Sequence, residues 1–522
     1  MKRRGTALFI TSLLSAAIAF AQGRGGADWT TAGNDAQRSS WLRTDPKISR
    51  ESMQKPGFAF LWKIKFENEA RQMNGLMPAV LLDRYIGHRG FRSLAFIGGS
   101  SDNVFAVDTD LGRIEWQNHY PAAAGSASSS AACPGGITTS LTRPTPIAIP
   151  AMPAGGGFGG FGRGGPAKSG VGEAGQGAVT LAELSQGRGG RGGFPNAPPG
   201  RGAPGAPDAG RGAARGGGGG GFGRMPSLTY ALTGDGMLQS MYVSNGADSE
   251  PPLKFLPPHA NAQGLIVADN AAYAATVNGC GGAPNGVWAL DLESKKVSTW
   301  SPGAGTPVAG ANPAIGPDGS LYVTTAGGDG SLVALEPKTL KQKDAYSAGA
   351  DFSSTPVVFD YKGKTLVAAG TKDGAIHLLD GASLKTALAK STSKDGPVTG
   401  LATWQDGGTR WILASTAHTV DAWKVVDRNG APGLEPGWTS HDMVSPLTPM
   451  VVNGVVFAVA GGGPSSHAVL YALDGASGKE YWNSGTTIGS FVHTGGLAGG
   501  GSQLYLGTHD GTLWAFGFPI EH

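Results

Sequence analysis

Short runs of alternating apolar and polar residues recur along this chain at a nearly constant spacing. Each run ends on a small or apolar residue, and eight such positions align. They are Ala106, Ser240, Ala289, Ala334, Leu378, Ala422, Ala472 and Ala515. The last six intervals are 49, 45, 44, 44, 50 and 43 residues, whereas the first is 134 residues. Alternation predicts strands, and a strand repeat of about 40–50 residues is typical of a β-propeller. We therefore expect an all-β, eight-bladed propeller of four-stranded antiparallel blades.

A longer pattern, with an alanine, a glycine six residues later and a tryptophan four residues after that, occurs twice with identical spacing. The two copies are Ala106, Gly112, Trp116 and Ala472, Gly478, Trp482. The small alanine permits close approach, and the glycine permits a hairpin turn. The tryptophan can bury a large area between blades. We interpret all six residues as structural.

The last blade lacks an outer strand of its own, because the chain ends seven residues after Ala515. Near the other end, Phe58 to Phe66 alternates apolar and polar residues and contains Trp62. This segment is predicted to be the outer strand of the eighth blade. Such a closure removes an exposed sheet edge.

The first residues have the pattern of a signal peptide. Lys2, Arg3 and Arg4 precede an apolar stretch from Ala7 to Phe20, and Ala19-Phe20-Ala21 fits a cleavage site. Residues 1–21 are therefore predicted to be removed, with cleavage near Ala21, which leaves 22–522 as a single periplasmic or secreted propeller domain. No later segment has the roughly 20 apolar residues of a transmembrane helix. The net charge of +3 and the 15% of charged residues do not indicate a nucleic-acid partner.

The long first interval contains a segment, about 155–224, dominated by Gly, Pro, Ala and Arg. Few large apolar side chains are present there to offset the entropy of ordering. We expect a disordered insert in the second blade.

Cys133 and Cys280 are the two cysteines of the chain, and each lies in a glycine-containing loop. A disulfide would persist in an oxidising compartment. The sequence leaves their pairing open, although the alignment assigns them to neighbouring blades.

Two further motifs resemble the PQQ-type propellers, a superfamily that includes the quinoprotein alcohol dehydrogenases and the non-enzymatic BamB-like proteins. The repeat motif matches in Ala472-Leu473-Asp474, Gly478-Lys479, Trp482, Gly507-Thr508 and Asp510-Gly511. The segment DWTTAGNDAQRSSW resembles the start of mature quinoprotein dehydrogenases through Asp28, Trp29, Gly33, Asp35 and Arg38. The resemblance implies an eight-bladed ring with a funnel-shaped face, where the enzymes of the family bind PQQ and Ca²⁺.

The catalytic features of those enzymes are missing from this sequence. We find no D-P-x-x-N-L-like stretch with its Asp base, no adjacent cysteines and no C-x-x-C-H motif. Alcohol oxidation by a quinone needs a base and a polarising cation. The sequence therefore favours a non-catalytic binding or scaffold module with a protein or small-molecule ligand at a propeller face. The alternative is a PQQ- and Ca²⁺-dependent dehydrogenase that oxidises an alcohol or a sugar.

A few residues are candidates for ligand or cofactor binding. Trp404 and Trp411 offer a stacking surface for a ring-shaped ligand. His441, Asp442 and His493 precede the first strands of the last two blades, where loops reach the central channel. The carboxylates considered for a calcium site, which no spacing distinguishes, are Asp351, Asp360, Asp406 and Asp442. We assign no catalytic residue and no metal ligand from the sequence.

Overall fold

The structure, a computed structural model, describes residues 28–87, 90–121, 130–149, 227–303 and 305–519. The predicted signal peptide, 1–21, and the predicted insert at about 155–224 fall outside these ranges. The described residues form almost exclusively strands and turns.

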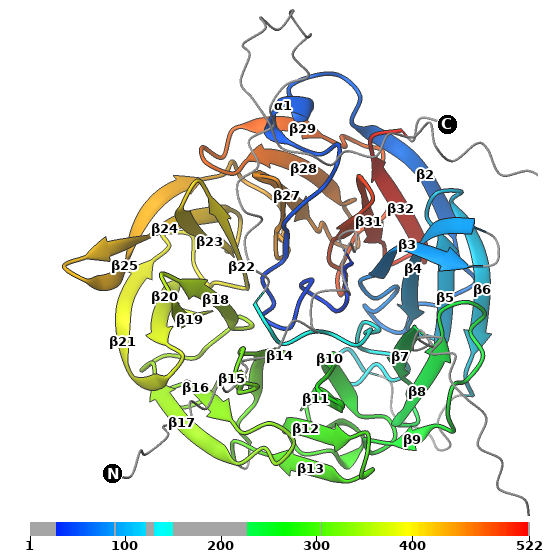
Figure 1. The fold of residues 1–522 in the computed structure, drawn as a ribbon, viewed down its shortest axis with the longest axis horizontal. Helices are drawn as coiled ribbons and strands as arrows, with labels where there is room; N and C mark the ends of the chain where they lie inside the picture. The colour runs from blue at the N-terminus through cyan, green and yellow to red at the C-terminus, as the bar shows by residue number, and fades with distance from the viewer. Residues whose placement is uncertain (1–27, 88–89, 122–129, 150–226, 304, 520–522) are drawn as a thin grey trace, which may run out of the picture. The chain divides into compact units, whose positions relative to one another are not determined.

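Eight sheets are arranged in a ring around a common centre (Figure 1). Blade 1 contains β3 (Val80–Gly87), β4 (Gly90–Gly99), β5 (Asn103–Asp108) and β6 (Arg113–His119). Blade 2 contains β7 (Leu228–Leu232), β8 (Met237–Tyr242) and β9 (Leu253–Lys254). Blade 3 contains β10 (Asn261–Ala268), β11 (Ala271–Val277), β12 (Gly286–Asp291) and β13 (Val297–Trp300). Blade 4 contains β14 (Val308–Ile315), β15 (Leu321–Thr325), β16 (Ser331–Leu335) and β17 (Gln342–Ser347).

The second half of the ring repeats this order. Blade 5 contains β18 (Val357–Tyr361), β19 (Lys364–Gly370), β20 (Ala375–Asp380) and β21 (Ser383–Thr392). Blade 6 contains β22 (Gly400–Asp406), β23 (Thr409–Ser415), β24 (Val420–Arg428) and β25 (Ala431–Thr439). Blade 7 contains β26 (Met450–Val452), β27 (Val455–Ala460), β28 (Val469–Asp474) and β29 (Glu480–Asn483). Blade 8 contains β30 (Ala498–Gly500), β31 (Gln503–Gly507), β32 (Thr512–Gly517) and β2 (Ala59–Lys65).

The predicted fold is confirmed. All eight aligned positions lie in the third strand of a blade, counted from the centre outwards. The innermost segment of blade 2 is short, because Thr142 alone exchanges both of its backbone hydrogen bonds with Tyr230. The predicted closure is also observed: β2 pairs antiparallel with β32, and Trp62 lies opposite Ala515.

Buried apolar side chains lie between neighbouring blades. The cluster that joins blades 5 and 6, for example, includes Phe359, Leu378, Ile412 and Trp423. Full burial of each such side chain contributes about 1.5–3 kcal/mol. Adjacent blades therefore stabilise one another.

Tryptophans of the outer strands pack on glycine turns of the next blade. The Trp116 indole N–H donates to the carbonyl of Val243, at 3.0 Å, and a Cβ built on Gly246 would lie 2.6 Å from the Trp116 ring. Trp62 has the same relation to Gly112, where a Cβ would lie 2.9 Å from the ring. These turns need glycine both for the contact and for their positive φ.

An extended segment before the first blade runs inside the ring, where it is visible as the dark blue trace (Figure 1). We call residues 29–42 the N-terminal collar. Its last residues, β1 (Trp41–Leu42), pair in parallel with β26. Beyond it, α1 (Arg50–Met53) leads to β2 at the outside of the ring.

The collar contacts the innermost strands of successive blades. Its carbonyls accept six backbone hydrogen bonds, from Leu81 to Trp29, Arg143 to Thr30, Ile315 to Ala36, Val358 to Gln37, Thr403 to Ser39 and Val451 to Ser40. The donors belong to blades 1, 2, 4, 5, 6 and 7. In blade 3, the Thr31 hydroxyl donates to the carbonyl of Leu265. The collar thus connects seven blades in their order along the chain.

The tryptophan–glycine contact gives a first prediction. Gly112→Ala should cost about 1–2 kcal/mol for the left-handed backbone and about 1–3 kcal/mol more for the clash with Trp62. Gly363→Ala is the matched control, because Gly363 also has a positive φ but open space at its Cβ. Chemical denaturation should show the larger loss for Gly112→Ala. Equal losses would contradict a role for the Trp62 contact.

His377 gives a second prediction. Its ring is 1% exposed, and Nδ1 lies 3.0 Å from the Tyr346 hydroxyl. Burial lowers the pKa of His377 to about 4 from 6.5. The unfolded chain therefore binds a proton more tightly than the folded chain, and stability falls as the pH drops from about 7 to 4.

The expected contribution of His377 to that loss is about 3 kcal/mol. Denaturation curves at pH 7 and pH 4 give the loss in the free energy of unfolding between the two pH values. This loss should be smaller by that amount in His377→Gln than in the wild type. Parallel pH profiles would show that the ring does not titrate in this way.

Candidate functional site

A cavity of about 640 Å³ lies at the centre of the ring, on the face where the innermost strands begin. The loops that enter those strands supply most of its wall, so that several blades contribute side chains. Its hydroxyl-bearing residues are Ser40, Thr138, Thr139, Ser140, Thr355, Thr399, Thr416, Ser445, Thr448 and Thr494. The wall also contains apolar side chains, among them Met77, Leu401, Leu447 and Leu497. The cavity wall therefore combines uncharged polar groups with apolar side chains.

The collar also lines this cavity, through Ala32, Gly33, Arg38 and Ser40. Arg38 is 3% exposed. Its guanidinium donates to the carbonyls of Pro313, Ala32 and Gly264 and to the Thr31 hydroxyl, over 2.6–2.9 Å. Arg38 thus connects the collar to blades 3 and 4.

Arg38 gives the wall a positive charge. Burial lowers the pKa of Arg38 to about 10, against a smaller opposing effect of Asp35, so the group stays protonated at neutral pH. Among the described residues that line the cavity, none is Asp or Glu. His493 is the one histidine of that wall, and burial together with His509 lowers its pKa.

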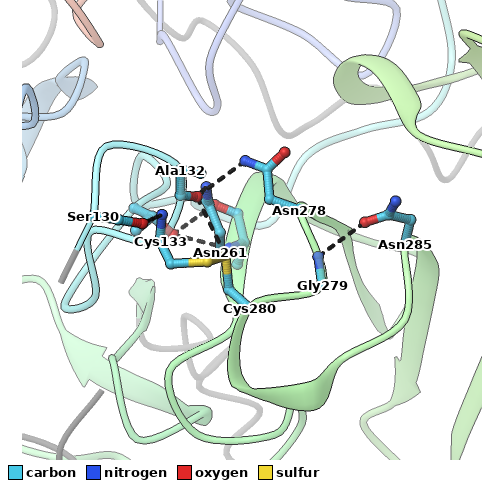
Figure 2. Close-up of a disulfide and its surroundings, with 10 residues drawn as sticks. Ser130, Ala132, Cys133, Asn261, Asn278, Gly279, Cys280 and Asn285 are labelled. Atoms are coloured by element: carbon cyan, nitrogen blue, oxygen red, sulfur yellow. Dashed lines mark hydrogen bonds between the residues drawn. A yellow bond between two sulfur atoms is a disulfide. The ribbon is translucent and has the colours of Figure 1, made fainter. Parts of the chain in front are cut away.

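A disulfide joins Cys133 and Cys280 (Figure 2). Cys133 precedes Thr138, Thr139 and Ser140 of the cavity wall, and Cys280 lies in the turn between β11 and β12.

Two asparagines reinforce this connection between blade 2 and blade 3. The side-chain amides of Asn261 and Asn278 both donate to the carbonyl of Ala132, at 2.8 and 3.0 Å (Figure 2). The loop that carries the three hydroxyls is therefore fixed to blade 3 by the disulfide and by these two hydrogen bonds. In addition, the Thr138 hydroxyl donates to the carbonyl of Ala262 and accepts its N–H, and the Thr139 hydroxyl accepts the N–H of Leu265.

Trp404 and Trp411 lie in the core at blades 6 and 7. They are 1% and 4% exposed, and their rings stack on each other with centroids 6.2 Å apart. A Cβ on Gly475 would lie 2.7 Å from the Trp404 ring, and Arg50 covers that ring from 5.4 Å. Neither tryptophan is part of the cavity wall.

Of the remaining candidates, His493 alone reaches the cavity. His441 is exposed, with its ring against Tyr471 and Nδ1 3.8 Å from Glu480, and Asp442 is also exposed.

The candidate carboxylates do not converge at the cavity. Asp351 pairs with Lys372, and Asp406 pairs with Arg50. The carbonyl of Asp360 accepts a hydrogen bond from Arg410. No group of three or more His, Cys, Asp or Glu that could hold a metal occurs among the described residues. The wall thus lacks the carboxylates that Ca²⁺ prefers, and it does not fit a calcium–PQQ pair.

The hydroxyl-lined wall was not recognised from the sequence. Threonines and serines before a strand are common, and only the repeat register shows that those of several blades face one cavity. Arg38 belongs to the N-terminal motif that resembles the start of quinoprotein dehydrogenases. That resemblance is the feature of the sequence that pointed to the collar.

Comparison with known proteins identifies the fold. No protein-family model matches the sequence, and no curated protein matches it. Among solved structures, a quinohemoprotein alcohol dehydrogenase from Comamonas testosteroni is 13% identical, with a TM-score of 0.53 over 95% of this chain and 81% of that chain. The quinohemoprotein alcohol dehydrogenase ADHIIG from Pseudomonas putida HK5 is 12% identical, with a TM-score of 0.56 over 96% and 81%. BamB from Moraxella catarrhalis is 14% identical, with a TM-score of 0.49 over 89% and 99%.

The chain therefore has the fold of the PQQ-type β-propellers, as the resemblance implied. None of the helices in the described ranges combines the length and the apolar character needed to cross a membrane.

The disulfide gives a third prediction. Replacing both cysteines, Cys133→Ser with Cys280→Ser, should lower the stability by about 2–5 kcal/mol, because the bond closes a loop of 147 residues. Thermal unfolding of the variant should match that of the reduced wild type. If the oxidised and reduced wild type melted at the same temperature, the bond would not constrain this part of the ring.

Proposed function

We propose that this chain is an exported propeller that binds a small ligand in its central cavity and does not turn it over. The observation that carries the proposal is the cavity wall, to which loops of several blades and the collar contribute hydroxyls at one place. Cavities of a few hundred cubic ångströms with convergent polar groups are typical ligand sites. In this proposal the mature chain, 22–522, is one propeller with a glycine-rich insert.

Two features support export. The pattern of residues 1–21 fits a cleaved signal peptide. The disulfide between Cys133 and Cys280 fits a periplasmic or extracellular location, since such bonds are reduced in the cytosol.

The chemistry of the wall favours binding over oxidation. An alcohol dehydrogenase needs a base that takes the hydroxyl proton and a cation that polarises the acceptor. The described wall offers a single histidine and no carboxylate. The second candidate function, a PQQ- and Ca²⁺-dependent dehydrogenase, rests on the N-terminal motif DWTTAGNDAQRSSW, which includes Asp28, Gly33 and Arg38.

The fourth prediction tests ligand binding with a variant that fills the cavity. Thr399 is exposed and lines the cavity, so Thr399→Phe should occupy part of it. Thr392→Phe is the matched control, because Thr392 is exposed on the outer strand β21. The probes are glucose, succinate and inorganic phosphate. Their binding is measured as the shift that each causes in thermal unfolding.

At roughly ten times its Kd, a probe that binds should stabilise the wild type and Thr392→Phe by about 1.4 kcal/mol. Thr399→Phe should show no such shift. If no probe stabilised the wild type, small-ligand binding would be rejected. Stoichiometric binding of PQQ with Ca²⁺, seen in the quinone absorbance and followed by alcohol oxidation, would establish the dehydrogenase instead.

A further inference from the structure

We propose that the central cavity is a site for a small oxyanion, a carboxylate or a phosphate, which Arg38 attracts and Ser140 helps to hold. This inference rests on the proposed function, because it names the chemical class of the ligand in the same cavity.

The first argument is the charge of Arg38. The four hydrogen bonds that its guanidinium donates all end on neutral oxygens, three of them backbone carbonyls. Carbonyl dipoles satisfy the N–H groups, but they do not neutralise the charge. A buried charge is costly unless it is paired. No carboxylate in the described ranges lies within 4.0 Å of the Arg38 guanidinium.

Asp35 is the carboxylate that raises the pKa of Arg38, and both of its oxygens already have other partners. One of its carboxylate oxygens accepts the backbone N–H of Ser39, at 2.9 Å. The other accepts the Ser39 hydroxyl, at 2.6 Å, and pairs with Arg43 at 3.3 Å. Asp35, Arg38 and Arg43 together carry a net charge of +1, and the pairing of Asp35 with Arg43 leaves Arg38 as the cation without a close carboxylate.

The second argument is a hydroxyl without a partner. Ser140 is 4% exposed and lines the cavity, and its Oγ has no hydrogen-bond partner. A buried unsatisfied hydroxyl costs about 1–3 kcal/mol. The Oγ itself is covered, so a rotation of the Ser140 side chain towards the cavity would bring this hydrogen to the oxygen of an anionic ligand. Hydrogen bonds to charged groups are the stronger kind.

The wall around these two residues is suited to an anion. Its other polar side chains include the hydroxyls of Thr448 and Thr494, which can donate, and the amides of Gln263 and Asn312. The described wall contains no acidic side chain that would repel a negative ligand. A neutral ligand would leave Arg38 uncompensated, whereas an oxyanion pairs with it across a low-dielectric wall.

The fifth prediction is tested by calorimetric titration of the disulfide-bonded protein with succinate, inorganic phosphate and glucose. Succinate or phosphate should bind, and glucose should not. Added salt should lower the affinity for the anion. The two anions distinguish a carboxylate ligand from a phosphate ligand. Thr399→Phe should abolish the signal, which separates the cavity from surface sites.

Two substitutions test the assigned residues. Ser140→Ala should weaken anion binding about tenfold, as expected for a lost hydrogen bond to a charged group. Ser353→Ala is its control, because the Ser353 hydroxyl donates to the carbonyl of Val398 and lies outside the cavity. Arg38→Gln should abolish binding in protein that circular dichroism shows to be folded.

The outcomes separate this inference from the proposed function. Binding of glucose without either anion would overturn the oxyanion and leave a cavity for neutral ligands. Unchanged anion affinity in Ser140→Ala would overturn the assignment of Ser140, and a folded Arg38→Gln that binds normally would overturn that of Arg38. Absence of binding by all three probes would reject both proposals.

Discussion

The backbone hydrogen bonds between the collar and the innermost strands are the interaction on which the centre of this structure depends. Within its own blade, an innermost strand pairs on one side only, and its other edge faces the centre of the ring. Unpaired backbone groups away from water are costly. Six carbonyls between Trp29 and Ser40 accept N–H groups from six blades, and Thr31 reaches a seventh. The collar thus fulfils at the inner edge the role that β2 fulfils at the outer edge of blade 8.

The same segment defines the candidate site. The path of the collar brings Gly33 and Arg38 together, since a Cβ on Gly33 would lie 3.3 Å from the Cα of Arg38. This tight turn directs the guanidinium to carbonyls of blades 3 and 4 and leaves its charge at the cavity. In the proposed site, stability and ligand recognition would therefore share one side chain, which is why its tests rely on Ser140 and Thr399 as well.

The sequence was most informative where the structure repeats. The period located the third strand of every blade, and the short last repeat identified Phe58 to Phe66 as the closing strand. It was least informative for contacts between distant residues: Arg38 and its partner Pro313 are 275 residues apart, and no local pattern encodes their pairing. Trp404 was expected to stack on a ligand, but the sheet register places it opposite Trp411 in the core.

The fold alone does not decide between a binding protein and an enzyme, because propellers support both. The decision depends on which groups reach the cavity. Proton abstraction requires a base within hydrogen-bond reach of the substrate, and a cation site requires several oxygen ligands that converge. Here the blades direct hydroxyls towards the centre, while carboxylates such as Asp351 and Asp406 pair with basic residues elsewhere. Half of the wall hydroxyls, among them those of Thr138 and Thr355, already donate to protein oxygens. With one buried cation and the remaining hydroxyls, such a wall can stabilise a negative charge that a ligand already carries, but it offers little help in moving a proton or a hydride.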